Sequence, residues 1–305
     1  MVLTKRGAPQ RAAVTTKFPT EEQWLRGVRS RRLRRLFPVG IGAVMITVMI
    51  VVAILAPQIA PFSPSAQSPE FVLKGPGADG GKYVLGTDDY GRDLFSRIIW
   101  GTRVSIKVGL GAVVVGFFTG VPLGIIAGFM AGKIEMVIMR LMDMLLAFPT
   151  LLLALVIVTA LGGSLTNEII AIGIALMPNF VRLARSLALT IRENDYIMAA
   201  RALGGSQLRV MLRHIFPNAV STLLVISTLY VASAIRAEAS LSFLGLGIPP
   251  PAPSWGNILS EGRQYIRCCL WLTTFSGLSI MLAVLAFNVV GDALRDLLDP
   301  RLRGE

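Results

Sequence analysis

The sequence contains few of the residues from which catalytic and metal centres are usually built. It has one histidine, His214, and two cysteines among 305 residues. No cysteine or acidic residue stands at metal-ligand spacing from His214, and no serine lies in a Gly-x-Ser-x-Gly nucleophile pattern. Cys268 and Cys269 are adjacent, so we expect two packed thiols rather than a vicinal disulfide or a metal contact. The chain is therefore predicted to be no enzyme by itself and to bind no metal or cofactor.

A nucleotide-binding loop is also absent from the one stretch that resembles it, GPGADGGKY. A P-loop has a glycine five residues before its Gly-Lys pair and a serine or threonine after it. Pro76 and Tyr83 occupy those two positions. No nucleotide site is expected in this segment.

Charge is scarce, whereas long hydrophobic runs are abundant. Charged residues make up 16% of the chain and hydrophobic residues 53%, and the mean hydropathy is +0.65. A helix crosses a bilayer with about 20 apolar residues. The candidate segments are residues 39–60, 104–130, 137–161, 169–187, 219–241 and 272–290. The sequence therefore predicts an all-α integral membrane protein with six transmembrane helices.

Acidic residues are fewer than basic ones, 18 against 30, and the position of the basic excess indicates the topology. Ten of the basic residues precede Pro38, including the run RSRRLRRLF next to the first span. By the positive-inside rule both termini are cytoplasmic, although Arg92, Arg97, Arg103 and Lys107 oppose this assignment. The first span is predicted to be a retained anchor rather than a cleaved signal. The basic excess is interpreted as a topology signal, and no nucleic-acid partner is expected.

These spans imply a simple domain organisation. We expect a basic cytoplasmic tail, a first transmembrane helix, an extracytoplasmic loop with an amphipathic approach to the membrane, a five-helix core and a cytoplasmic C-terminal tail. The predicted bounds are 1–38, 39–60, 61–103, 104–292 and 293–305, and the core contains a cytoplasmic loop at 190–217. A second outer loop, residues 242–271, contains three consecutive prolines and is predicted to be extended.

Glycines recur every four residues along the second span, and this spacing predicts close helix packing. On a helix they form one stripe where a neighbouring backbone can approach. The residues are Gly116, Gly120, Gly124, Gly128 and Gly132. Their partner could be another span of this chain or a span of a second subunit.

Charges inside the spans are few and lie near the span ends, which argues against a proton-coupled carrier. Asp143 could pair with Arg140, three residues before it. Arg236 and Glu238 are interpreted as a structural ion pair or as interface contacts rather than as a proton relay.

The cytoplasmic loop contains AARALGGSQLRVMLRHIFPNA, which predicts a hairpin of two short helices. Asp195 can cap the first helix, Gly204 and Gly205 supply a left-handed turn, and Ser206 caps a second helix that stops at Pro217. The second helix carries an apolar stripe and two basic residues on another face: Leu208, Met211, Leu212, Ile215, Arg209 and Arg213. Such a hairpin could lie on the membrane surface or fit a groove in a soluble partner.

The hairpin resembles the signature of ATP-binding-cassette (ABC) importer permeases, Glu-Ala-Ala, three residues, Gly, nine residues, Ile, one residue, Leu-Pro. Ala199, Ala200, Gly204 and Pro217 match it. Met198, His214 and Phe216 replace the signature Glu, Ile and Leu. In that family the acidic residue contributes to the contact with the ATPase, so Met198 is expected to change the polarity of that contact.

Five further strings resemble the C-type permease subunit of dipeptide and oligopeptide importers. They are LGTDDYGRDLFSR, AFP, RHIFPN, LSFLGLG with PAPSWG, and NVVGDALRDLLDPRLRG. The resemblance runs from about residue 38 to residue 304 and implies the type I ABC importer permease fold. Glutathione and nickel importers share this subunit type, so the resemblance leaves the substrate open.

The resemblance also implies partners: a second, B-type permease, two cytoplasmic ATPases that use ATP and Mg²⁺, and an extracytoplasmic peptide-binding protein. The chain would be a multi-pass protein of the bacterial inner membrane, surrounded by lipid, and would form half of the translocation path. Ala199, Ala200, Gly204, Gly205 and Pro217 would shape the coupling unit. Arg201 and Arg209 would make polar contacts with an ATPase. Substrate-binding residues are not predicted. An ion-coupled transporter and a lipid-binding membrane scaffold are the alternatives.

Overall fold

The computed structural model describes residues 21–298 and, within them, the side chains of residues 39–296. The described chain is helical apart from its connections, with two isolated β-bridges and no named strand among these residues. The elements are α1 (Glu21–Ile59), η1 (Pro69–Phe71), α2 (Leu94–Met130), α3 (Gly132–Leu146), α4 (Thr150–Leu161), α5 (Leu165–Arg192), α6 (Asp195–Ala202), α7 (Gln207–Val210), η2 (Met211–Ile215), α8 (Phe216–Phe243), α9 (Trp255–Arg263) and α10 (Leu270–Leu298).

The chain divides into two compact units between Phe37 and Pro38, where the basic tail was predicted to end. The predicted tail 1–38 is helical from Glu21 onwards, and residues 1–20 lie outside the described part of the chain. The predicted C-terminal tail 293–305 begins as the last turns of α10, and residues 299–305 likewise lie outside the described residues.

Five helical stretches of the described chain are long and apolar enough to cross a membrane. They are Val39–Ile59, Leu94–Met130, Leu165–Arg192, Gln207–Phe243 and Leu270–Asp296. The prediction of one continuous third span over residues 137–161 is wrong: α3 and α4 meet at an angle of 88°. Pro149 lies in the break, where it can donate no backbone hydrogen bond and disfavours helix in the residue before it. Six crossings are reached when this bent pair counts as one span.

The two outer loops are also shorter than predicted. Asp93 caps α2 by accepting a hydrogen bond from the Ser96 amide at 2.8 Å, so the expected amphipathic approach is the first part of α2 itself. The connection before it covers residues 60–93. In the second loop Ser254 caps α9 in the same way, through the Asn257 amide at 3.1 Å. A side-chain oxygen that satisfies a free amide fixes where each helix begins.

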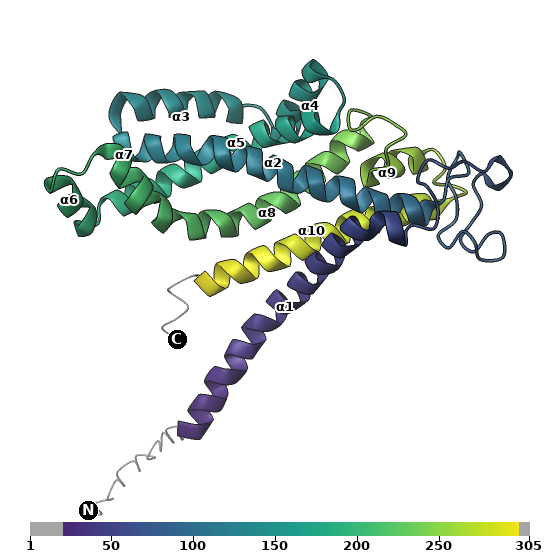
Figure 1. The fold of residues 1–305 in the computed structure, drawn as a ribbon, viewed down its shortest axis with the longest axis horizontal. Helices are drawn as coiled ribbons and strands as arrows, with labels where there is room; N and C mark the ends of the chain where they lie inside the picture. The colour runs from purple at the N-terminus through teal and green to yellow at the C-terminus, as the bar shows by residue number, and fades with distance from the viewer. Residues whose placement is uncertain (1–20, 299–305) are drawn as a thin grey trace, which may run out of the picture. The chain divides into compact units, whose positions relative to one another are not determined.

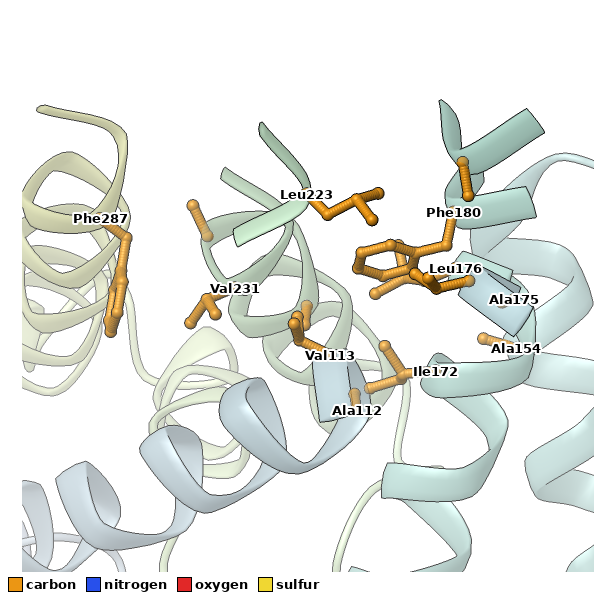
Figure 2. Close-up of a cluster of buried hydrophobic side chains, with 14 of the residues drawn as sticks. Ala112, Val113, Ala154, Ile172, Ala175, Leu176, Phe180, Leu223, Val231 and Phe287 are labelled. Carbon is orange, nitrogen blue, oxygen red and sulfur yellow. The ribbon is translucent and has the colours of Figure 1, made fainter. Parts of the chain in front are cut away.

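The core of the unit that begins at Pro38 is organised around α2 and α5. Ala112 and Val113 of α2 face Ile172 of α5, and Phe180 lies between α5 and α8 (Figure 2). The Phe180 ring packs edge-on against Tyr230 of α8, with ring centroids 4.8 Å apart. Interlocked aromatic and branched side chains of this kind fix the position of α8 against the α2–α5 pair.

Four of the predicted glycines pack against α5 of the same chain. A Cβ atom at Gly120 would lie 2.8 Å from the Met177 carbonyl oxygen, and one at Gly128 would lie 2.6 Å from the Arg185 carbonyl oxygen. Gly116 and Gly124 meet the α5 backbone in the same manner. Gly132 does not belong to this contact: it has φ +64° at the α2–α3 junction and no atom near its Cβ position. The glycine stripe ends at Gly128, because α2 itself ends at Met130.

The outer end, which we define as the end formed by residues 60–93 and α9, is held by a buried ion network. Asp88 is fully buried, and its Oδ2 accepts from Arg92 Nε at 2.6 Å and from Arg97 Nη1. Arg97 Nη1 also donates to Glu261 Oε2 of α9 at 2.6 Å, and Arg92 Nη2 donates to the same oxygen at 3.2 Å. Two arginines that opposed the charge-based topology are thus neutralised inside the protein.

The same network surrounds the cluster of Asp88, Asp89 and Glu261. Their carboxylate oxygens are close enough to share an ion. The guanidinium groups of Arg92 and Arg97 already supply the positive charge there. Asp89 lies at the edge, where burial, followed by the charges of Glu261 and Asp88, raises the pKa of its carboxyl group.

The structure contradicts the possible pairing of Asp143 with Arg140 and the ion-pair alternative for Arg236 and Glu238. Asp143 pairs with Arg182 of α5 at 2.6 Å instead of with Arg140 of its own helix. Arg236 and Glu238 do not pair with each other: Arg236 donates to Ser233, whereas Glu238 is fully buried and accepts from Ser105 and Ser242. Residues two apart on a helix point in different directions, which explains the separation.

We expect Gly124→Val to destabilise the bundle, because the new side chain would collide with the Val181 carbonyl and with Ala184. Overpacking a dense core costs roughly 1–3 kcal/mol. The apparent thermal unfolding midpoint of the detergent-purified protein measures this loss. Gly277→Val is the matched control, because no atom lies within 4 Å of that Cβ position. Equal losses in both variants would contradict the packing argument.

Arg97→Met should destabilise the outer end more strongly, because it leaves Glu261 and Asp88 with less positive charge in a buried site. Breaking a buried ion pair costs roughly 3–5 kcal/mol. The double variant Arg97→Met with Glu261→Gln should regain part of that loss, since one carboxylate is then neutral. Thermal unfolding of the two variants tests the coupling, and identical midpoints would argue against it.

Candidate functional site

The predicted hairpin is present as α6 and α7, at the end of the bundle opposite residues 60–93 and α9 (Figure 1). We refer to residues 195–210 as the hairpin. The residue that precedes α6 is Asn194, not Asp195, so the predicted cap is displaced by one position. Asn194 donates its side-chain amide to the Ile191 carbonyl at 3.0 Å and makes no cap to α6. Asp195 lies in the first turn, where its charge complements the helix dipole.

The turn that ends α6 explains why two glycines follow each other. Gly204 has φ +82° and donates to the Arg201 carbonyl at 3.0 Å, and Gly205 donates to the Ala200 carbonyl at 3.0 Å. This pair of bonds is the Schellman motif, which closes a helix with a left-handed residue. Only Gly204 is left-handed. Gly205 is required for space, because a Cβ atom there would lie 2.7 Å from the Ala200 oxygen.

The second half of the hairpin does not end at Pro217, and that prediction is wrong. After α7, residues Met211–Ile215 form a π turn, in which the Phe216 amide donates to the Met211 carbonyl, and the chain continues directly into α8. Pro217 lies in the first turn of α8. A proline has no amide to donate, and the π turn changes the hydrogen-bond pattern immediately before it. The hairpin is therefore continuous with a membrane span.

One face of the hairpin is anchored in the core. Ile197 and Val210, together with Ile215 of the π turn that follows, are at most 1% exposed and belong to the main hydrophobic cluster. The Arg201 guanidinium lies over the Phe129 ring at the end of α2, 5.2 Å from its centroid. The Arg201 contact ties the hairpin to the end of α2, and the buried residues tie it to the main core of the bundle.

The opposite face is exposed and apolar. Leu203 is 89% exposed, and Tyr196, Met198 and Leu208 are each about half exposed or more. The predicted apolar stripe divides accordingly: Met211 and Ile215 are buried, whereas Leu208 and Leu212 are exposed. The remaining predicted site residues are Ala199, Arg209 and Pro217, all exposed, and Ala200, which is half-buried. An apolar patch of this kind with basic neighbours indicates a protein-binding surface.

The structure also shows hollows beside α8 that sequence reasoning missed. A hollow of about 400 Å³ lies between α4, α5 and α8, and one of about 470 Å³ adjoins it toward α9. Ser233, Arg236 and Ser240 of α8 line the first of them. Their spacing of three and four residues is a polar stripe on an otherwise apolar helix, a signal that was available in the sequence.

Comparison with known families agrees with this architecture. Residues 120–304 match the family model described as binding-protein-dependent transport system inner membrane component. Residues 29–76 match the model described as N-terminal TM domain of oligopeptide transport permease C. The first match covers more than half of the chain and includes the hairpin and the α8 hollows.

Individual relatives align with this chain over most of their length. The chain is 45% identical to the dipeptide transport system permease protein DppC of Alkalihalophilus pseudofirmus over 86% of each chain. It is 43% identical to the Escherichia coli protein of the same name, over 86% of this chain and 89% of that one. It is also 43% identical to the glutathione transport system permease protein GsiD of Pectobacterium atrosepticum, over 72% and 73%.

A solved structure shows the same fold at low sequence identity. An inward-facing form of the MetNI methionine ABC transporter matches with a TM-score of 0.56 and 16% identity, covering 67% of this chain and 97% of that chain. This fold similarity and the sequence matches confirm the resemblance inferred from the hairpin and its accompanying strings. The chain belongs to the family of binding-protein-dependent transport system inner membrane components.

Proposed function

We propose that this chain is the C-type permease subunit of an ATP-driven importer for dipeptides or oligopeptides. It would pair with a B-type permease, bind two cytoplasmic ATPases that use ATP and Mg²⁺, and receive substrate from an extracytoplasmic binding protein. The chain itself would catalyse no reaction. The observation that carries this proposal is the anchored hairpin with its exposed apolar face, which two membrane spans flank directly.

The hairpin could transmit motion because of its connections. Two residues, Glu193 and Asn194, separate it from α5, and the π turn joins it to α8 without a break. The same two helices form walls of the 400 Å³ hollow. When the ATPases close, a tilt of the hairpin would change the relative position of α5 and α8 and thereby the access to that hollow, as alternating access requires.

The contact with the ATPase would be mainly apolar in this protein. Met198 replaces the acidic residue of the family signature and is 53% exposed beside Tyr196 and Leu203. Arg209 and Arg213 remain exposed and could supply polar contacts at its edge. Arg201 is already stacked on Phe129, so its guanidinium would contribute less to the partner than predicted. An apolar groove on the ATPase is the complementary surface.

The names of the similar proteins support peptides as the substrate class. Permeases named for dipeptide and di/tripeptide transport are 44–45% identical to this chain. Glutathione is the second candidate, because the glutathione permease is 43% identical over a shorter part of the chain. Purification of the complex from its native membrane, followed by mass spectrometry of the ligand on its binding protein, distinguishes the two. A lone chain that moved solute without ATP would instead support an ion-driven carrier.

Gly204→Val should uncouple ATP hydrolysis from transport. A β-branched residue is strained at φ +82°, so the Schellman turn would rearrange and the exposed face of the hairpin would change shape. We expect normal membrane insertion of the assembled transporter, with peptide uptake reduced to near background in proteoliposomes.

The matched control is Gly132→Val, which has the same left-handed backbone and an equally open Cβ position but lies outside the hairpin. It should retain most of the uptake. Normal uptake in the Gly204→Val transporter would argue against the hairpin as the coupling element.

A further inference from the structure

Arg236 is unusual because it is a charged residue inside a span without an acidic partner. Its Nη2 donates to Ser233 Oγ at 3.0 Å, and among the described residues no carboxylate lies within ion-pair distance of it. Glu238, which is nearest in sequence, is fully buried on another face of α8 and accepts from Ser105 at 2.9 Å and Ser242 at 3.1 Å. The charge of Arg236 is therefore available to a ligand.

Arg236 lies where the two hollows beside α8 meet. It lines both the 400 Å³ hollow between α4, α5 and α8 and the 470 Å³ hollow that reaches toward α9, and Leu151 and Ser240 line both as well. The two hollows therefore adjoin each other along α8, and we refer to them together as the groove. Arg236 stands about two helical turns before α8 ends at Phe243.

The groove has the polarity expected for a peptide. Asn179 offers a side-chain amide, and Ser233 and Ser240 offer hydroxyl oxygens as acceptors, because their hydroxyls donate to the Leu229 and Arg236 carbonyls. None of the residues that line either hollow is acidic. The Tyr230 ring is fixed edge-on by Phe180 and closes one side. A volume of about 400 Å³ is within the range of small-ligand sites. A cation among neutral polar groups favours an anionic ligand, and a carboxylate fits the planar guanidinium group.

We propose that Arg236 binds the C-terminal carboxylate of the peptide as it passes along this groove. The inference rests on the proposed importer function and deepens it by assigning a substrate contact. The guanidinium would hold the carboxylate, while the hydroxyl oxygens of Ser233 and Ser240 would accept hydrogen bonds from peptide N–H groups. An unpaired arginine is costly in lipid, and a groove open to water would lower that cost at this position in the span.

The test uses the complete transporter in proteoliposomes, with radiolabelled alanyl-alanine on saturating binding protein. Charge-assisted hydrogen bonds of this strength correspond to about a ten- to hundredfold effect. We expect Arg236→Gln to reduce the uptake rate by that factor, while the ATP hydrolysis stimulated by loaded binding protein stays within about twofold of the parent. Arg236→Lys, which keeps the charge, should recover much of the uptake.

Lys107→Gln on α2 is the matched control. Lys107 is exposed and lies at the level of Arg236, because Ser105 bonds to Glu238 and Gly109 packs against Ile235, but it lines neither hollow. Uptake by the Lys107→Gln transporter should equal that of the parent.

Parent-like uptake in Arg236→Gln would overturn the carboxylate site and leave the importer function intact. A parallel loss of uptake and ATP hydrolysis would also overturn it, in favour of a coupling role. Failure of the parent complex to import peptide with ATP would instead refute the proposed function.

Discussion

The contact of α2 with α5 is the constraint on which the arrangement of the other helices depends. Membrane helices gain little from the hydrophobic effect once they are in lipid, so close backbone packing has to hold them together. Here four glycines of α2 place their backbone against carbonyl groups of α5. Gly173 of α5 in turn packs against Ala112 and Val115 of α2. Because α5 leads into the hairpin and forms one wall of the groove, the position of both proposed functional regions follows from this pair.

Much of the fold could be predicted because its signals are local. Hydropathy located the long spans, and the four-residue glycine period identified a packing face, although only the structure shows that α5 is its partner. The break at Pro149 was missed because a hydropathy window reads through a short bend when both arms are apolar. The start of α2 was placed too late for a related reason: its first turns carry polar residues that are buried in the ion network and not exposed in a loop.

Contacts between distant residues could not be predicted from local spacing. Asp143 lies three residues from Arg140, yet it bonds to Arg182, which belongs to a neighbouring helix. Arg97 and Glu261 are far apart in sequence and meet only because α2 and α9 converge at the outer end. In the hairpin, composition indicated a glycine turn, but the different demands on Gly204 and Gly205 depend on backbone geometry that residue type alone does not reveal. Arg236 was visible in the sequence, and it was interpreted as part of a structural ion pair or as an interface contact.

The π turn before Pro217 lets the two ends of the helical stretch Gln207–Phe243 change independently of each other. A π turn accommodates one more residue than an α turn, and one residue corresponds to a rotation of about 100° around a helix axis. The face that α7 turns outward is therefore out of phase with the face that α8 turns toward the groove. Insertion or removal of one residue in this turn would rotate the exposed face of the hairpin while the groove kept its lining. Pro217 thus follows a turn that sets the rotation of the hairpin relative to α8.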